Sequence, residues 1–103
     1  MMGIVVSLQT ENGNDIASVS DPTNLLHKVL PELDDPRFRF ANTIDWYGDT
    51  VFNRLQTELL RKEWALLIQH STDDETRTLL KQIDELLLRC ISDVHLYVKF
   101  TGD

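Results

Sequence analysis

The chain has 103 residues, of which 42% are hydrophobic and 26% charged, and these values predict one soluble globular domain over residues 1–103. Ten basic against seventeen acidic residues give a formal net charge of −7, which repels phosphate backbones and anionic lipids. We therefore expect no nucleic-acid or membrane partner, and consider a basic protein partner or self-association instead.

The location of the protein and its redox chemistry follow from what the sequence lacks. No apolar run approaches the roughly 18 residues that a membrane span requires, and the start of the chain lacks signal-peptide features, so we expect a cytoplasmic protein. Cys90 is the single cysteine, which excludes a disulfide or a cysteine-rich metal site within one chain. It lies in an apolar helical repeat and is expected to fill the core.

The first third of the chain predicts a hairpin and a short helix. Residues 3–20 alternate apolar and polar side chains on either side of an Asn-Gly turn, which is typical of a β-hairpin. Asp21 then suits a helix N-cap, Pro22 the first helical position, and Pro31 the end of the helix. The apolar stripe of this short helix consists of Leu25, Leu26, Val29 and Leu30.

Residues 37–44, "RFRFANTI", predict a middle strand. Their period of two directs Phe38 and Phe40 to the core and the intervening arginines to solvent, although an irregular extended segment has the same pattern. The aromatic and cationic side chains then face opposite ways, so they do not form a shared platform for nucleic acid.

The sequence from Thr50 changes to a helical period. The first helix is expected to run to His70, with a broad apolar face that contains Phe52, Leu55, Leu59 and Leu66 and a flank of Leu60, Trp64, Leu67 and Ile68. Thr72 and Glu75 have the spacing of a capping box that opens a second helix. Its apolar stripe contains Leu79, Leu80, Ile83, Leu86, Leu87, Cys90 and Ile91. A short loop between two amphipathic helices favours an antiparallel pair.

The chain closes with "VHLYVKF", in which Leu96, Val98 and Phe100 alternate with polar residues. This pattern predicts a strand that joins the hairpin sheet at an edge or end. The predicted fold class is therefore α+β with two layers. A small antiparallel sheet, made of the N-terminal hairpin, a middle strand and a C-terminal strand, packs on an antiparallel helix pair plus one short helix.

The usual catalytic and cofactor motifs are missing. Four widely spaced glycines cannot form a phosphate-binding loop, so we expect no nucleotide cofactor. His27, His70 and His95 lie on three separate elements, at spacings that suit neither a nucleophile and base pair nor zinc. We assign no catalytic residue and no metal ligand, and we expect the paired Asp34 and Asp35 to form a solvated turn.

Residues 45–54 are the densest polar and aromatic stretch in the chain. Gly48 suits a sharp turn, Asp49 a helix N-cap, and Trp46 an extension of the core. These roles leave four residues unexplained, namely Asp45, Tyr47, Asn53 and Arg54. They are the candidate ligand- or partner-binding site, and the alternatives are a local network in which Arg54 neutralises Asp45, or catalysis.

These observations favour a small acidic interaction or regulatory protein that is not an enzyme and binds a protein partner. The alternative is a small-ligand-binding protein or enzyme that uses the loop at residues 45–54, which requires a concave pocket there. A homodimer formed through the helices or a sheet edge is a third hypothesis.

Overall fold

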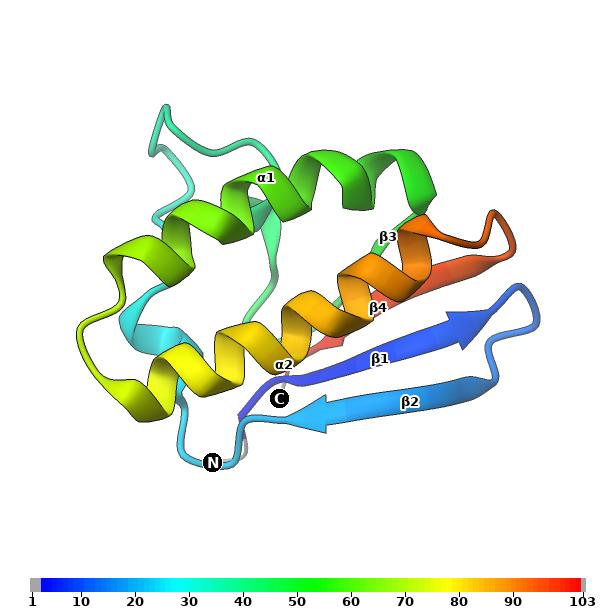
Figure 1. The fold of residues 1–103 in the computed structure, drawn as a ribbon, viewed down its shortest axis with the longest axis horizontal. Helices are drawn as coiled ribbons and strands as arrows, with labels where there is room; N and C mark the ends of the chain where they lie inside the picture. The colour runs from blue at the N-terminus through cyan, green and yellow to red at the C-terminus, as the bar shows by residue number, and fades with distance from the viewer. Residues whose placement is uncertain (1–2, 103) are drawn as a thin grey trace.

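Four antiparallel strands form one sheet, and two helices lie side by side on one of its faces (Figure 1). The computed structural model describes residues 3–102. The sheet order is β2-β1-β4-β3, and the bounds are β1 Val5–Thr10, β2 Asp15–Ser20, β3 Asp49–Phe52, β4 Leu96–Thr101, α1 Arg54–His70 and α2 Asp74–Ile91. This arrangement confirms the two-layer α+β prediction. In the described residues, neither helix is both long enough and apolar enough to cross a membrane.

The predicted hairpin is confirmed as β1 and β2. Gly13 has a φ of 81°, the left-handed backbone conformation that favours glycine in this turn. Val6 lies opposite Val19 and Leu8 opposite Ala17, so these apolar side chains face the helices. The register shifts between Leu8 and Gln9, near the turn.

The short helix after the hairpin is a 3₁₀ helix, η1, at Leu25–Lys28. It begins later than predicted, because the chain first turns through Asn24, whose φ of 58° is left-handed. Pro22 is therefore not the first helical residue. Asp21 still caps the helix from a distance: its buried carboxylate accepts the N–H groups of Leu25 and Leu26, each at 2.8 Å.

The predicted middle strand at residues 37–44 is wrong. The segment instead ends in a 3₁₀ helix, η2, at Ala41–Thr43. The physical reason lies in α1, where the Glu63 carboxylate accepts the backbone N–H groups of Arg39, Phe40 and Ala41 at 2.9–3.3 Å. Those donors are no longer free to pair with a neighbouring strand. Phe38 is nevertheless buried, as its place in the alternation predicts.

The third strand lies later, at Asp49–Phe52, in place of the predicted first turn of a helix. Asp49 is consequently not an N-cap, and its carboxylate pairs with Lys99 of the adjacent strand at 3.3 Å. Asn53 caps α1 instead. It accepts the N–H of Gln56 at 2.9 Å, and the Gln56 side chain accepts the N–H of Asn53 at 3.0 Å. This reciprocal capping box fixes the start of the helix at Arg54.

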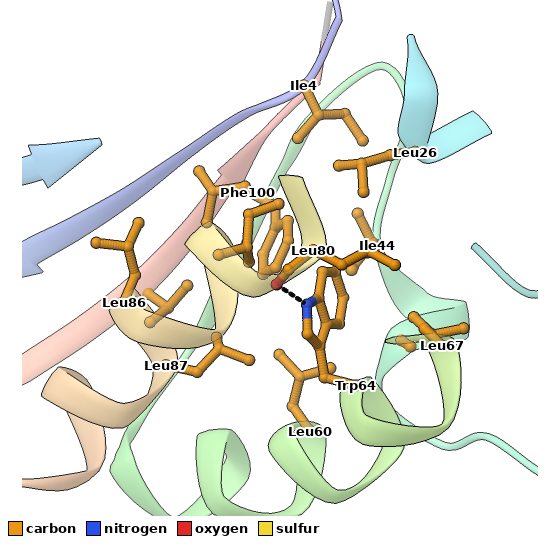
Figure 2. Close-up of a cluster of buried hydrophobic side chains, with 14 of the residues drawn as sticks. Ile4, Leu26, Ile44, Leu60, Trp64, Leu67, Leu80, Leu86, Leu87 and Phe100 are labelled. Atoms are coloured by element: carbon orange, nitrogen blue, oxygen red, sulfur yellow. Dashed lines mark hydrogen bonds between the residues drawn. The ribbon is translucent and has the colours of Figure 1, made fainter. Parts of the chain in front are cut away.

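The buried face of α1 differs from the predicted one. Leu60, Trp64 and Leu67, expected on its flank, face the core, and Trp64 Nε1 donates to the Leu80 carbonyl at 2.9 Å (Figure 2). The expected central residues are exposed instead: Leu55, Leu59 and Leu66 at 62%, 46% and 38%. The helix carries two apolar stripes, and the one with the larger side chain and a hydrogen-bond partner for its indole is buried.

The second helix matches its prediction except at its start. Asp73 is the N-cap and accepts the N–H of Thr76 at 3.3 Å, so the N-cap lies one residue later than the predicted Thr72 and the capping box of Thr72 with Glu75 is wrong. Leu79, Leu80, Ile83, Leu86, Leu87 and Cys90 are all buried, as predicted. This continuous stripe packs α2 against the sheet and against α1 (Figure 2).

The C-terminal strand is not at an edge. β4 pairs with β1 on one side and with β3 on the other, which places Val98 and Phe100 at the centre of the core. The edges of the sheet are therefore β2 and β3.

Candidate functional site

Strand β3 separates the four candidate residues into two pairs. Asp45 and Tyr47 precede the strand, and Asn53 and Arg54 follow it. Four residues of extended chain span roughly 13 Å. The structure therefore does not bring the four side chains together in one site.

Asp45 and Tyr47 form a closed turn at the start of β3. The Asp45 carboxylate accepts the N–H of Tyr47 at 2.9 Å, and the Asp45 N–H donates to Thr50 Oγ1 at 2.9 Å. The turn is held against the C-terminal end of β4, where the Gly102 N–H donates to the Gly48 carbonyl at 2.7 Å. The Tyr47 side chain is 77% exposed and is the part of this turn that another molecule can contact.

Trp46 is half-buried and packs against the edge of the core, in line with the prediction that it extends the core. Its ring also stacks on that of His27 from η1, with centroids 3.9 Å apart and planes 6° from parallel. The stack ties the loop before β3 to the 3₁₀ helix after the hairpin. The stack covers one face of each ring, so the first role of the two side chains is to hold these segments together.

Asn53 and Arg54 have structural partners. Asn53 makes the capping box of α1, and Arg54 Nη1 lies 3.3 Å from Glu58 Oε1, one helical turn further along. Arg54 is therefore not the counter-charge of Asp45. Of the proposed local network, only the closed turn around Asp45 forms.

The hollow nearest this loop, of about 360 Å³, is lined in part by Asp45 and Trp46. Tyr47, Asn53 and Arg54 do not line it. The geometry that a ligand-binding or catalytic role requires, several polar groups converging on one pocket, is thus not met by these four residues. Among the residues that the structure describes, no three His, Cys, Asp or Glu side chains lie close enough to hold a metal ion.

Two exposed charge pairs and one buried thiol have shifted pKa values. His95 Nδ1 lies 2.9 Å from Glu11 Oε1, and this hydrogen bond raises the pKa of His95 above its usual 6.5. The Arg37 guanidinium contacts both oxygens of Asp35 and lowers the pKa of that carboxyl. Burial raises the pKa of the Cys90 thiol, which lies 3.4 Å from the Leu96 carbonyl.

The two sheet edges differ in how far they are open to another chain. β3 has four residues, and the turn at residues 45–47 folds back on it through Thr50. β2 has six residues, and no other described segment runs along its outer side (Figure 1). The part of β2 from Ile16 to Ser20, called the β2 edge below, contains no proline and no charged residue.

The orientation of the backbone along the β2 edge follows from one hydrogen bond. The Asp21 N–H donates to the Ile4 carbonyl at 3.0 Å, so residues at odd positions in this part of β2 bond to β1. The alternate residues, Ser18 and Ser20, direct their N–H and carbonyl groups away from the sheet. Both side chains are exposed, as is that of Ile16 at 47%.

A shallow hollow of about 560 Å³ lies between the end of the β2 edge and α2. The charged residues that line it are all acidic, namely Asp21, Asp74 and Glu75. The Asp21 carboxylate accepts a backbone N–H of η1, and Asp74 pairs with Arg77 at 2.9 Å. Glu75, by contrast, is exposed. Sequence reasoning considered a sheet edge as a contact surface but did not assign it to β2, although a run of five uncharged residues without proline beside a hairpin turn could have indicated this strand.

Comparison of the chain with protein families, with curated proteins and with solved structures finds no match.

Proposed function

We propose that this protein is an interaction protein without enzymatic activity that binds an extended, basic segment of a protein partner along the β2 edge. The observation that carries the proposal is the outward-facing backbone of Ser18 and Ser20, on a strand along whose outer side no other described segment runs. Natural sheets protect such edges with lysine, proline, a bulge or a covering segment. Here the register shift places one extra residue, Ile16, in β2 between Asp15 and Ala17, close to the turn, and residues 17–20 pair regularly with β1.

The affinity would come from main-chain hydrogen bonds. An extended peptide added to β2 pairs with the N–H and carbonyl groups of Ser18 and Ser20, as in other complexes formed by strand addition. On the face that the helices cover, Ala17 and Val19 are half-buried and contact the core. Apolar residues at alternate positions of the peptide would extend this apolar surface.

The preference for a basic segment follows from charge. The formal charge of −7 attracts a cationic chain over a distance set by the ionic strength. Near the edge, the exposed carboxylates of Asp15 and Glu75 lie at opposite ends of β2, Asp15 within the strand and Glu75 at the hollow beside Ser20. A contribution of Tyr47 and Asp45 to partner binding stays a prediction, and these residues flank the opposite edge of the sheet.

The test uses a synthetic peptide that alternates lysine and valine, with an alternating glutamate and valine peptide as control. Binding is followed by NMR of the protein amides, and hydrogen exchange at the Ser18 and Ser20 N–H groups is expected to slow when the lysine peptide binds. Ser18→Pro removes an outward N–H that β1 does not use, so the fold is retained while peptide affinity falls at least about tenfold. Ser18→Ala keeps that N–H and should bind normally.

Two results would contradict the proposal. One is equal binding of the lysine peptide to the Ser18→Pro variant, because the outward N–H would then play no part. The other is a chemical-shift change confined to residues outside β2 and the start of α2.

A further inference from the structure

The outward face of the helix pair has an apolar surface that the β2 edge does not use. Leu55, Leu59 and Leu66 follow one another along the exposed side of α1 and form what we call the leucine ridge. Single exposed leucines are common on soluble proteins and need no explanation. Three on one stripe of one helix, beside an apolar groove, are a continuous surface.

The groove lies between α1 and α2 and has a volume of about 520 Å³. Its apolar lining consists of Leu59, Ala65, Ile68 and Ile91. Leu59 belongs to both features, so the leucine ridge borders the groove directly. The face therefore combines a protruding apolar element with a recessed one.

The charges around the groove are balanced and mostly paired. Its rim has two acidic residues, Glu58 and Asp84, and two basic ones, Arg61 and Lys62. Arg61 holds Asp84 with two hydrogen bonds, at 3.0 and 3.1 Å. Glu58 is paired with Arg54 at 3.3 Å.

The same balance holds for the whole helical layer. α1 and α2 together contain six Lys or Arg and six Asp or Glu, so the entire formal charge of −7 resides in the rest of the chain. A basic partner would gain no net electrostatic attraction from this face. A second copy of the chain, by contrast, is repelled by the acidic remainder everywhere except where two neutral helical layers meet.

We propose that the helical face binds a second copy of this chain, with the leucine ridge of each copy against the groove of the other. Such a contact is isologous: a two-fold axis through the face presents the same ridge and groove to both partners. Each helix is roughly 26 Å long and each is about 10 Å wide, so the two present roughly 500 Å² per copy. The total of roughly 1,000 Å² is near the lower limit for specific interfaces, and the dimer is therefore weak and reversible.

Sedimentation velocity between about 5 and 500 µM tests the proposal. The wild type is expected to pass from monomer to dimer within this range, with a dissociation constant in the micromolar range. Leu59→Ser combined with Leu66→Ser should remain monomeric throughout. The matched control is Leu33→Ser, which replaces an exposed leucine, at 75%, in a loop distant in sequence from both helices.

All three substitutions fall on exposed side chains, so circular dichroism should show unchanged folding. A wild type that stays monomeric at 500 µM, or a dimer that the Leu59 and Leu66 double variant forms equally well, overturns the proposal. A loss of dimer in Leu33→Ser of the same size also overturns it, because the helical face would not be the contact.

Salt distinguishes this interface from the one proposed at the β2 edge. The Debye length falls from about 10 Å at 0.1 M salt to about 3 Å at 1 M. Screening removes the repulsion between two acidic copies, so added salt should strengthen the dimer. Binding of a lysine-rich peptide should weaken instead, and Ser18→Pro should leave the dimer intact. Either proposal can thus fail without the other.

Discussion

Glu63 is expected to hold the segment at residues 39–41 onto α1, and its removal should destabilise the fold more than that of any exposed carboxylate on this helix. Its carboxylate accepts three backbone N–H groups, the shortest from Ala41 at 2.9 Å. The N–H groups of Phe40 and Ala41 are partly buried and that of Arg39 is exposed. After Glu63→Ala, water can reach the Arg39 N–H but has poor access to the other two.

The magnitude follows from those two groups. A hydrogen bond to a charged acceptor contributes roughly 1.5–3 kcal/mol, and a partly buried donor recovers some of this from water. We expect a loss of about 2–3 kcal/mol in the free energy of unfolding. Glu58→Ala is the matched control, since Glu58 lies on the same helix and makes only a partly exposed pair with Arg54, for which about 0.5 kcal/mol or less is expected.

The assay is urea unfolding followed by circular dichroism, with hydrogen exchange read at single amides. For an m-value of about 1–3 kcal/mol/M, the midpoint should fall by roughly 1–2 M in Glu63→Ala with m unchanged. Exchange should accelerate at the Phe40 and Ala41 amides before it does in α2. If Glu63→Ala and Glu58→Ala have the same midpoint, the account of why residues 37–44 are not a strand is refuted.

Three further outcomes follow from the structure. By NMR, the pKa of His95 should lie above its usual 6.5, and Glu11→Gln should return it toward that value. The stabilisation that this pair gives the folded state is complete below the pKa of histidine in the unfolded chain. It is lost as the pH rises through the pKa of His95 in the folded protein. Cys90 should react with a thiol reagent at the rate of unfolding, because its sulfur is buried and its pKa is raised; rapid modification of the folded protein would contradict the placement of α2. Gly102→Ala should lower stability by about 1–3 kcal/mol in the same urea assay, because its new Cβ would lie 2.4 Å from the backbone of Trp46; an unchanged midpoint would show that the end of β4 is free to move.

The elements that could be predicted from the sequence are those whose determinants are local. The hairpin turn requires a residue that tolerates a positive φ, and Asn12-Gly13 supplies it within the two strands it joins. The buried stripe of α2 is continuous and has no apolar competitor, so Leu80, Ile83 and Leu87 could be placed by period alone.

The predictions were wrong where the local sequence fits two conformations and a contact with a distant residue selects one of them. Residues 37–44 alternate apolar and polar side chains as a strand does. The carboxylate of Glu63, some twenty residues later in the chain, nevertheless accepts backbone N–H groups that a strand would use for pairing. On α1 both apolar stripes satisfy the helical period, and only contact with Leu80 selects the one with Trp64. The sequence could not identify β2 as the open edge for a related reason, since a strand becomes an edge only through the order of the other strands.

The candidate site at Asp45, Tyr47, Asn53 and Arg54 also depends on contacts that the sequence does not show. Polar residues close in sequence, such as Asp45 and Arg54, looked like one cluster, but a strand of four residues carries them to opposite ends of β3. Once that strand is formed, each side chain finds a nearer partner, and Arg54 pairs with Glu58. Proximity in sequence predicts a shared site only within a turn or along one face of a helix.

The distribution of charge gives the two proposed surfaces different partners. An excess of seven acidic residues concentrated outside the helices disfavours contact between copies through the sheet or its loops, and favours a cationic chain there. The neutral helical layer has neither effect, so its exposed leucines can be covered by an identical face. Because the β2 edge and the helical groove lie on different parts of the molecule, a dimer held through the helices would leave both β2 edges open. A partner with two basic segments could then bind both edges at once, and its apparent affinity should fall to that of a single segment in the Leu59 and Leu66 double variant.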